Sequence, residues 1–470
     1  MNFAEPIFVP FLLTVLLLDR LLPSKRAKVW MLLVASCVFY GWWNVRLLPL
    51  LFVTAILDFF LARFLSGTED PKLRKAIIVA SVCANLGLLG YFKYTNFAIS
   101  TLNDLFAWAG RMPPFAPIEV LLPVGISFYT FQSMSYTLDV YRRELRPDPS
   151  LPRFLCFVTL FPQLVAGPIV RAAELLPQLA DDYKNQRESA LFLILLGLFK
   201  KVVVADTLGA ALVDPAFASP GTQLPGVLWM GAYAYAFQIF CDFSGYSDIA
   251  IGCGKLLGYD FPKNFAAPYL SSSVGEFWRR WHVTLGAWFR DYVYVPLGGN
   301  RGGLGRWIFA SLAVFLLSGL WHGASYNFII WGALHGAAFV AERLVRRLRG
   351  GAPASSSLLR RGLGAVLTFH FVTAAWIFFR AQTLPDALSY LHGLSQGAPS
   401  LAGVAPTVVL ILGLAILLHI LVEPRIEVAW RAFARLPAPV QGAAVVLLGV
   451  VLYANTDAAM ARRAFIYFQF

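Results

Sequence analysis

Long apolar runs recur from one end of the chain to the other, and they limit its fold more than any other feature. Most of them approach the roughly 20 residues that an α-helix needs to cross about 30 Å of hydrocarbon. They are continuous, whereas the strands of a membrane barrel alternate apolar and polar residues. Because a helix satisfies its own backbone hydrogen bonds in lipid, the sequence predicts an all-α, polytopic integral membrane protein.

The composition of the 470 residues agrees with this class. Hydrophobic residues make up 58% and charged residues 14%, and the mean hydropathy is +0.64. The net charge of +13 sits in short basic clusters between apolar runs, where it sets orientation in the bilayer, so we expect no nucleic-acid partner. The five cysteines lie in or beside apolar segments without C-x-x-C spacing, so neither a disulfide framework nor a metal site is indicated.

The apolar runs predict about 11–14 membrane helices in one membrane domain over residues 1–470, because no segment between them is long enough to fold alone. Placing the basic cluster at 19–28 in the cytoplasm returns five later clusters to the same side. Successive spans should place the segments between them on alternating sides of the membrane, and the basic residues of segment 171–189 fit that pattern least. The composition of segment 350–357 is typical of a linker. The candidate spans lie near residues 7–22, 29–44, 47–64, 75–92, 117–140, 153–170, 190–206, 225–241, 243–258, 306–321, 325–341, 361–379, 405–422 and 439–455.

His322 lies between two apolar runs in the stretch SGLWHGASYNF. About 36 residues separate Arg306 from Glu342, so the two runs form a short hairpin with His322 at its turning point, deep in the membrane. Ionisable residues inside a membrane usually face a cavity and serve a function. The alternative is a neutral histidine that is hydrogen-bonded between helices.

A second histidine, His282, lies in the stretch 275–303, which is too charged to span a membrane. Apolar residues cover one face of a helical projection, which predicts an interfacial amphipathic helix near 275–295 in the cytoplasmic leaflet. These residues are Phe277, Trp278, Trp281, Leu285, Trp288, Phe289 and Tyr292. His282 falls at the edge of this face, where it either faces a site entered from the cytoplasm or is an ordinary interfacial anchor.

Two further stretches place polar or helix-breaking residues in apolar surroundings. Asp242 and Asp248 do not share a helical face, so each is expected to bond a neighbouring helix instead of forming a carboxylate pair. The prolines and glycine of 161–171 are expected to break a helix where backbone lines a cavity. The sequence has no Walker-type loop, dinucleotide fingerprint or G-x-S-x-G elbow, so nucleotide hydrolysis and serine-hydrolase chemistry have no support.

Four long motifs follow one another along the chain: FPQLVAGPIVR, DFSGYSDIAIGCGKLLGYDFPKNFAAPYLSSSVGEFWRRWHVTLGAWFRDYVYVPLGGNR, SGLWHGASYNFIIWGALHG and the closing FIYFQF. In this order they resemble the membrane-bound O-acyltransferase family, and within it the bacterial branch of the alginate O-acetylase membrane subunit. The resemblance covers nearly the whole chain. It implies a helical core around a transmembrane tunnel, with re-entrant or interfacial helices, in the inner membrane.

The resemblance implies that His322, in LWHG, is catalytic and that His282, in RRWH, is the second histidine of the site. It further implies an acetyl group that moves from a cytoplasmic thioester, acetyl-CoA, across the membrane to a periplasmic SGNH-like partner or an exopolysaccharide such as alginate. A neutral His322 would take the proton of the acceptor hydroxyl as general base, while His282 would orient the thioester or polarise its carbonyl. No metal and no bound cofactor are expected.

Neighbouring residues complete the expected site. Trp321 and Asn327 would position the base and the substrate. Guanidinium groups near His282 would pair with the phosphates of acetyl-CoA. These belong to Arg279, Arg280, Arg290 and Arg301.

Three other functions remain open at this stage. The first is D-alanyl transfer from a carrier protein to a cell-envelope polymer. The second is a non-catalytic transporter of a polysaccharide or acyl carrier, since broken helices and intramembrane polar groups suit a transporter equally. The third is a scaffold in a polysaccharide synthase complex.

Overall fold

The computed structural model describes residues 1–181, 189–350, 357–454 and 465–466. Within these residues all regular elements are helical, so the all-α prediction is confirmed. Part of the segment 171–189 and most of the linker 350–357 lie outside the described residues. Six helical stretches among the described residues are long and apolar enough to cross a membrane: Lys25–Gly67, Pro71–Trp108, Gly303–His322, Tyr326–Leu348, Leu358–Arg380 and Pro406–Ala434.

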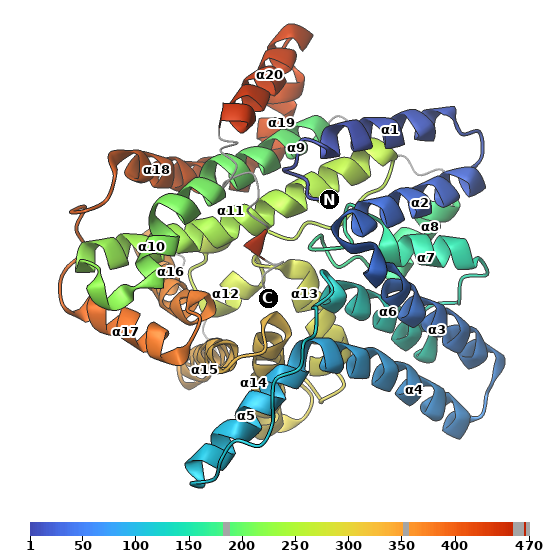
Figure 1. Ribbon diagram of the computed structural model, residues 1–470, viewed down its shortest axis with the longest axis horizontal. Helices are drawn as coiled ribbons and strands as arrows, with labels where there is room; N and C mark the ends of the chain where they lie inside the picture. Colours follow the sequence, from blue (N-terminus) through green and yellow to red (C-terminus); the bar gives the residue numbers. More distant parts are fainter. Residues whose placement is uncertain (182–188, 351–356, 455–464, 467–470) are drawn as a thin grey trace. The chain divides into compact units, whose positions relative to one another are not determined.

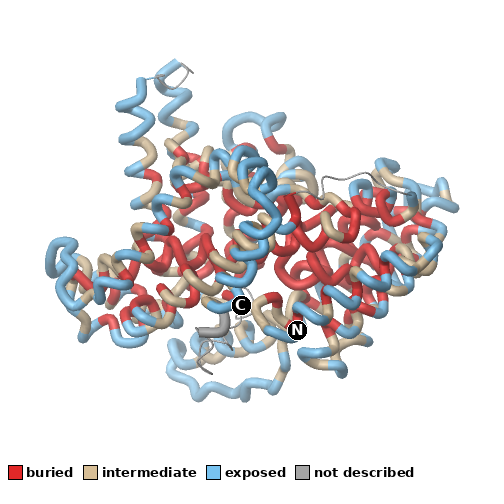
Figure 2. The backbone as a smooth tube through the Cα atoms, turned by 90° about the horizontal axis from the view of Figure 1, so that it is seen from above, coloured by how far each residue is buried: buried red, intermediate tan, exposed pale blue. Residues whose placement is uncertain are grey.

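The chain groups into two compact units, one of residues 1–187 and 253–261 and the other of residues 188–252 and 262–470. The single membrane domain expected from the sequence stays a prediction. In both units large apolar side chains are exposed, as lipid-facing helices require, and Figure 2 shows the exposed stretches in pale blue. Examples are Leu13, Phe64, Phe309 and Leu410.

The described residues of the first unit form eight α-helices with two short connecting turns of helix, whose course can be followed in Figure 1. They are α1 (Phe8–Leu21), α2 (Lys25–Asn44), η1 (Val45–Leu47), α3 (Leu48–Gly67), α4 (Pro71–Leu89), η2 (Gly90–Tyr94), α5 (Thr95–Trp108), α6 (Ile126–Tyr141), α7 (Leu151–Thr159) and α8 (Ala172–Ala180). The predicted break in 161–171 is confirmed, because this stretch is irregular between α7 and α8.

A buried carboxylate joins three helices of the first unit. Asp58 of α3 accepts hydrogen bonds from Ser81 (2.6 Å) and Asn85 (2.8 Å) of α4 and from Ser133 of α6 (2.6 Å). Asp58 is buried where water does not reach it. An acid in such surroundings needs hydrogen-bond donors from the protein, and these three side chains supply them.

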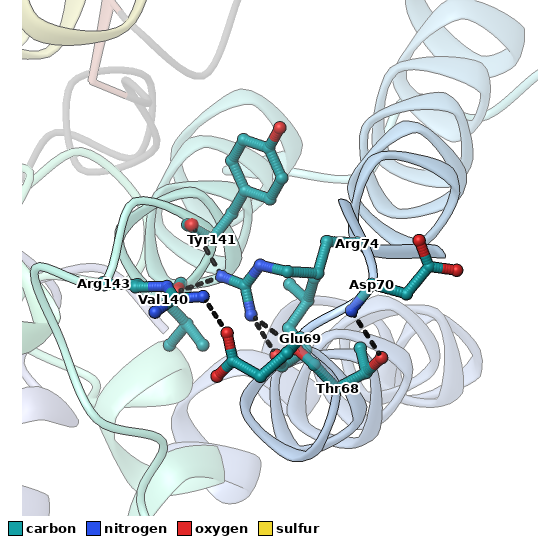
Figure 3. A network of polar contacts seen from close by, with 8 residues as sticks. Thr68, Glu69, Asp70, Arg74, Val140, Tyr141 and Arg143 are labelled. Carbon is teal, nitrogen blue, oxygen red and sulfur yellow. Dashed lines mark hydrogen bonds and ion pairs between the residues drawn. The ribbon is translucent and has the colours of Figure 1, made fainter. Parts of the chain in front are cut away.

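Arg74 fastens the ends of two helices of the same unit (Figure 3). Its guanidinium group donates to the carbonyl groups of Leu65 and Thr68 (3.2 Å) at the end of α3, and to that of Tyr141 (2.8 Å) at the end of α6. The last carbonyls of a helix have no partner within the helix, so this buried cation satisfies both ends at once.

The second unit contains the remaining elements. They are α9 (Ala190–Leu198), η4 (Phe199–Asp206), η5 (Gly209–Val213), α10 (Asp214–Ala218), η6 (Pro220–Thr222), α11 (Pro225–Leu257), whose last turn belongs to the first unit, η7 (Pro268–Leu270), α12 (Val274–Trp278), α13 (Val283–Phe289), η8 (Arg290–Tyr294), α14 (Gly303–His322), α15 (Tyr326–Leu348), α16 (Leu358–Arg380), α17 (Leu384–Ser395), α18 (Pro406–Leu421), η9 (Glu423–Arg425), α19 (Ile426–Ala434) and α20 (Ala438–Ala454).

Helix α11 corrects one expectation. The sequence predicted two spans at 225–241 and 243–258, but the structure has a single helix of 33 residues. Asp242 lies in its interior without breaking it, because an aspartate, unlike a proline, keeps its backbone donor. Its carboxylate also has a buried partner, so this polar position does not have to form a loop.

Two buried lysines of the π-helical η4 hold α11 in place, and each pairs with two carboxylates. Lys200 pairs with Asp248 (2.7 Å) and Glu423, and Lys201 with Asp206 (2.8 Å) and Asp242 (2.7 Å). The prediction that each aspartate of α11 bonds a neighbouring helix is confirmed.

Candidate active site

The hairpin of α14 and α15 carries His322 at its turn. Helix α14 ends at this histidine, about 30 Å from its start, and α15 begins four residues later. The helices touch through their backbones: a Cβ at Gly319 would lie 2.2 Å from the carbonyl oxygen of Phe328, and one at Gly332 would lie 2.4 Å from that of Phe315. The predicted turning point is confirmed, and the two glycines make the close approach possible.

The segment around His282 differs from the single amphipathic helix predicted near 275–295. Helix α12 ends after five residues, α13 starts at Val283, and η8 continues as a π-helix. The break is His282 itself, whose φ of +44° lies in the left-handed region. Side chains rarely adopt this conformation unless neighbouring groups hold it.

Asn264 supplies the groups that hold the break. Its Oδ1 lies 3.0 Å from Nδ1 of His282 and accepts hydrogen bonds from the hydroxyl (3.0 Å) and the N–H (3.4 Å) of Thr284. Its carbonyl accepts the N–H of Val283 at 3.0 Å. Sequence reasoning missed Asn264, and its place in the motif DFPKNF was the available signal.

The two histidines meet at one tryptophan ring. The ring centroid of Trp321 lies 5.9 Å from that of His282 and 4.9 Å from that of His322. Both histidines are buried, with 1% and 3% of their surface exposed. His282 thus lies beside the end of α14 that carries His322, and its expected position in the cytoplasmic leaflet stays a prediction. The left-handed residue separates α12 from α13, so the two do not form one continuous helix.

Aromatic rings enclose both imidazoles. The rings of Trp331 and Phe379 each lie 5.1 Å from that of His322, and the ring of Phe243 lies 4.7 Å from that of His282. Desolvation by burial lowers the pKa of His282 to about 3, so its ring is neutral at physiological pH. The site therefore holds a neutral imidazole in surroundings from which water is excluded.

A third histidine belongs to the same aromatic cluster. Nδ1 of His335 lies 3.3 Å from Nε1 of Trp278, which donates the hydrogen bond, and the Trp331 ring lies 5.0 Å from His335. Trp331 therefore contacts His322 on one side and His335 on the other. The contact of His335 with Trp278 favours a packing role for this histidine.

The other predicted site residues separate into two groups. Asn327 is buried, but its Nδ2 donates to the carbonyl of Ala381 at 2.9 Å and so fastens the start of α15 to the end of α16. Arg280 is half-buried and pairs with Glu276 at 2.5 Å. The remaining arginines are exposed, and Arg290 also pairs with Asp291. They are Arg279, Arg290 and Arg301.

Comparison with known proteins places this arrangement in a family. The family profile described as MBOAT, membrane-bound O-acyltransferase family, matches residues 126–381. The chain is 41% identical to the probable alginate O-acetylase AlgI of Pseudomonas aeruginosa, over 82% of this chain and 73% of that protein.

Two further relatives differ in the group that their names say they transfer. The peptidoglycan O-acetyltransferase of Helicobacter pylori is 38% identical over 78% of this chain and 73% of that protein. The teichoic acid D-alanyltransferase of Bacillus subtilis is 27% identical over 62% of this chain and 78% of that protein. The chain belongs to the membrane-bound O-acyltransferase family and is a membrane-bound O-acyltransferase.

Proposed function

We propose that this enzyme moves an acetyl group from a cytoplasmic thioester, acetyl-CoA, to a hydroxyl on the far side of the inner membrane. The acceptor would be a periplasmic SGNH-like partner protein or an exopolysaccharide such as alginate. The observation that supports this most is the pair of buried histidines that share the Trp321 ring. The relatives named as O-acetylases are also more similar to this chain than those named as D-alanyltransferases.

In the proposed reaction His322 is the general base. Its neutral imidazole takes the proton of the acceptor hydroxyl while the oxygen attacks the thioester carbonyl. A C–O bond forms and the C–S bond breaks, and the departing thiolate receives the proton from the imidazolium. The enclosing rings of Trp331 and Phe379 keep water from the base, which favours transfer over hydrolysis of the thioester.

On the donor side, an exposed arginine would bind the phosphates of the coenzyme. The exposed guanidinium group of Arg279 lies in the same chain segment as His282, where it suits the phosphates of a coenzyme bound at the surface. Arg280 and Arg290 already pair with Glu276 and Asp291, so they are less suited to this role.

A labelled donor tests the proposal. The purified enzyme in lipid nanodiscs receives acetyl-CoA labelled in the acetyl group, and label bound covalently to the acceptor is measured. We expect His322→Ala to abolish transfer, while the matched control His392→Ala, at an exposed position of α17, keeps it. Undiminished transfer by His322→Ala would show that another group is the base.

D-alanyl transfer is the second candidate, because a teichoic acid D-alanyltransferase of Streptococcus thermophilus is 30% identical over 54% of this chain. The same assay with a D-alanyl thioester of a carrier protein decides between the donors. Transfer of D-alanine without transfer of acetyl would favour this candidate. Since the related proteins are named as an O-acetylase and an O-acetyltransferase, they do not favour the non-catalytic transporter or the scaffold.

A further inference from the structure

The amide of Asn264 has one possible orientation in its buried position. One end faces His282 and Thr284, and the other lies 3.3 Å from the hydroxyl of Ser247 on α11. A backbone N–H only donates, so the atom that faces the N–H of Thr284 must be the carbonyl oxygen. The NH2 group of Asn264 therefore points to Ser247 and donates to it.

This orientation assigns the proton on the neighbouring imidazole. The oxygen of Asn264 can only accept, and Nδ1 of His282 lies 3.0 Å from it, so Nδ1 must carry the hydrogen. In a neutral imidazole the other nitrogen, Nε2, then carries a lone pair and no hydrogen. Burial keeps the ring neutral, because it lowers the pKa of His282 to about 3.

The backbone around this contact holds the same geometry. The φ of His282 is left-handed, and the segment that contains Asn264 forms backbone hydrogen bonds with the residues before and after His282. The N–H of Val283 donates to the carbonyl of Asn264 at 3.0 Å, and the N–H of Ala266 donates to that of Arg280 at 2.9 Å. The ring is thus fixed in direction as well as in tautomer.

We propose that Asn264 is a positioning residue that holds His282 as the Nδ1–H tautomer, so that Nε2 accepts a hydrogen bond from the substrate. This rests on the proposed acyl transfer at the two histidines. A ring without hydrogen on Nε2 cannot donate a hydrogen bond to the thioester carbonyl. In this proposal His282 therefore does not polarise that carbonyl, as the sequence led us to expect, but accepts a hydrogen bond. Its partner is instead an N–H or O–H donor, which is either an amide of the thioester arm or the acceptor hydroxyl.

The tautomer itself can be measured without any enzymatic assay. The full-length protein is labelled with 15N in its histidine rings and reconstituted in nanodiscs, and His282→Gln identifies the resonances of His282. We expect Nδ1 of His282 to be protonated and Nε2 to be unprotonated at neutral pH. Asn264→Leu removes the acceptor and should abolish this preference, whereas Asn264→Asp keeps an acceptor oxygen and should retain it. A hydrogen on Nε2 in the unaltered protein would overturn the proposal.

Kinetics then test the positioning role. Asn264→Leu should lower kcat at least about tenfold, with partial rescue by Asn264→Asp. Ser247→Ala is the matched control, because it removes only the partner of the NH2 group, and it should keep both the tautomer and most of kcat. A raised KM for the thioester in His282→Gln would identify the amide as the partner, and a raised KM for the acceptor would identify the hydroxyl.

The two proposals fail in different ways. Loss of the tautomer signal with intact dependence on His322 would remove the role of Asn264 alone. Transfer that persists in His322→Ala, with the tautomer signal present, would remove the proposed base alone. Equal kcat in Asn264→Leu and the unaltered enzyme would contradict the positioning role even if the tautomer is as expected.

Discussion

Asn327 shows how one side chain can be adjacent to a site in sequence and still serve the fold. Its amide donates to the carbonyl of Ala381, so the group expected to position substrate is already engaged between two helices. We expect Asn327→Ala to lower the free energy of unfolding by about 1–2 kcal/mol, because a buried carbonyl loses its donor.

Thermal unfolding in detergent, with the KM for the thioester measured in parallel, checks this prediction. A lower Tm with an unchanged KM supports the structural role. A raised KM at unchanged Tm would instead assign Asn327 to the substrate.

At the scale of the element, the α14–α15 hairpin depends on glycines that let two backbones touch. A Cβ at Gly332 would lie 2.4 Å from the carbonyl oxygen of Phe315, and backbone cannot yield as a flexible side chain can. Gly332→Ala should therefore push the helices apart, at a cost of about 1–3 kcal/mol, and reduce transfer because His322 stands at the end of α14.

The other helix of the hairpin, α14, supplies the control for this prediction. A Cβ at Gly305 would meet no atom within 4 Å, so Gly305→Ala should be neutral or slightly stabilising because alanine favours helix. Unfolding temperatures and transfer rates of both variants are compared in nanodiscs. Equal behaviour of the two variants would show that the close approach is not needed.

At the scale of the whole molecule, buried charge joins parts of the chain that are far apart in sequence. Lys201 lies between Asp206 and Asp242, and the second oxygen of Asp242 accepts the N–H of Ile466 at 2.8 Å. Lys201→Met would leave both carboxylates without their cation, and we expect a loss of about 3–5 kcal/mol in the free energy of unfolding.

Two further variants serve as a control and a rescue for this prediction. Lys72→Met removes an exposed lysine and should change stability by less than about 0.5 kcal/mol. Adding Asp242→Asn to Lys201→Met should recover part of the lost stability, because one uncompensated charge disappears. Unfolding curves in detergent measure all three, and a stable Lys201→Met protein would contradict a structural role for this cation.

Features that depend on neighbouring residues could be predicted from the sequence. The apolar runs predicted a helical membrane protein, the prolines and glycine of 161–171 predicted a break, and the short hairpin predicted His322 at a turn. Each rests on helix length, backbone geometry or the cost of charge in lipid, all of which act over a few residues.

The position of His282 was decided only by the tertiary structure. Periodicity predicted a straight helix because local propensity does not favour a left-handed histidine, and the partner that holds it, Asn264, lies 18 residues earlier. For the same reason the unbroken α11 could not be expected, since its interior Asp242 is satisfied by Lys201, 41 residues away. The sequence by itself determined that the apolar runs form helices and that His322 lies at a turn between two of them. Packing between distant segments decided that His282 and His322 share one tryptophan.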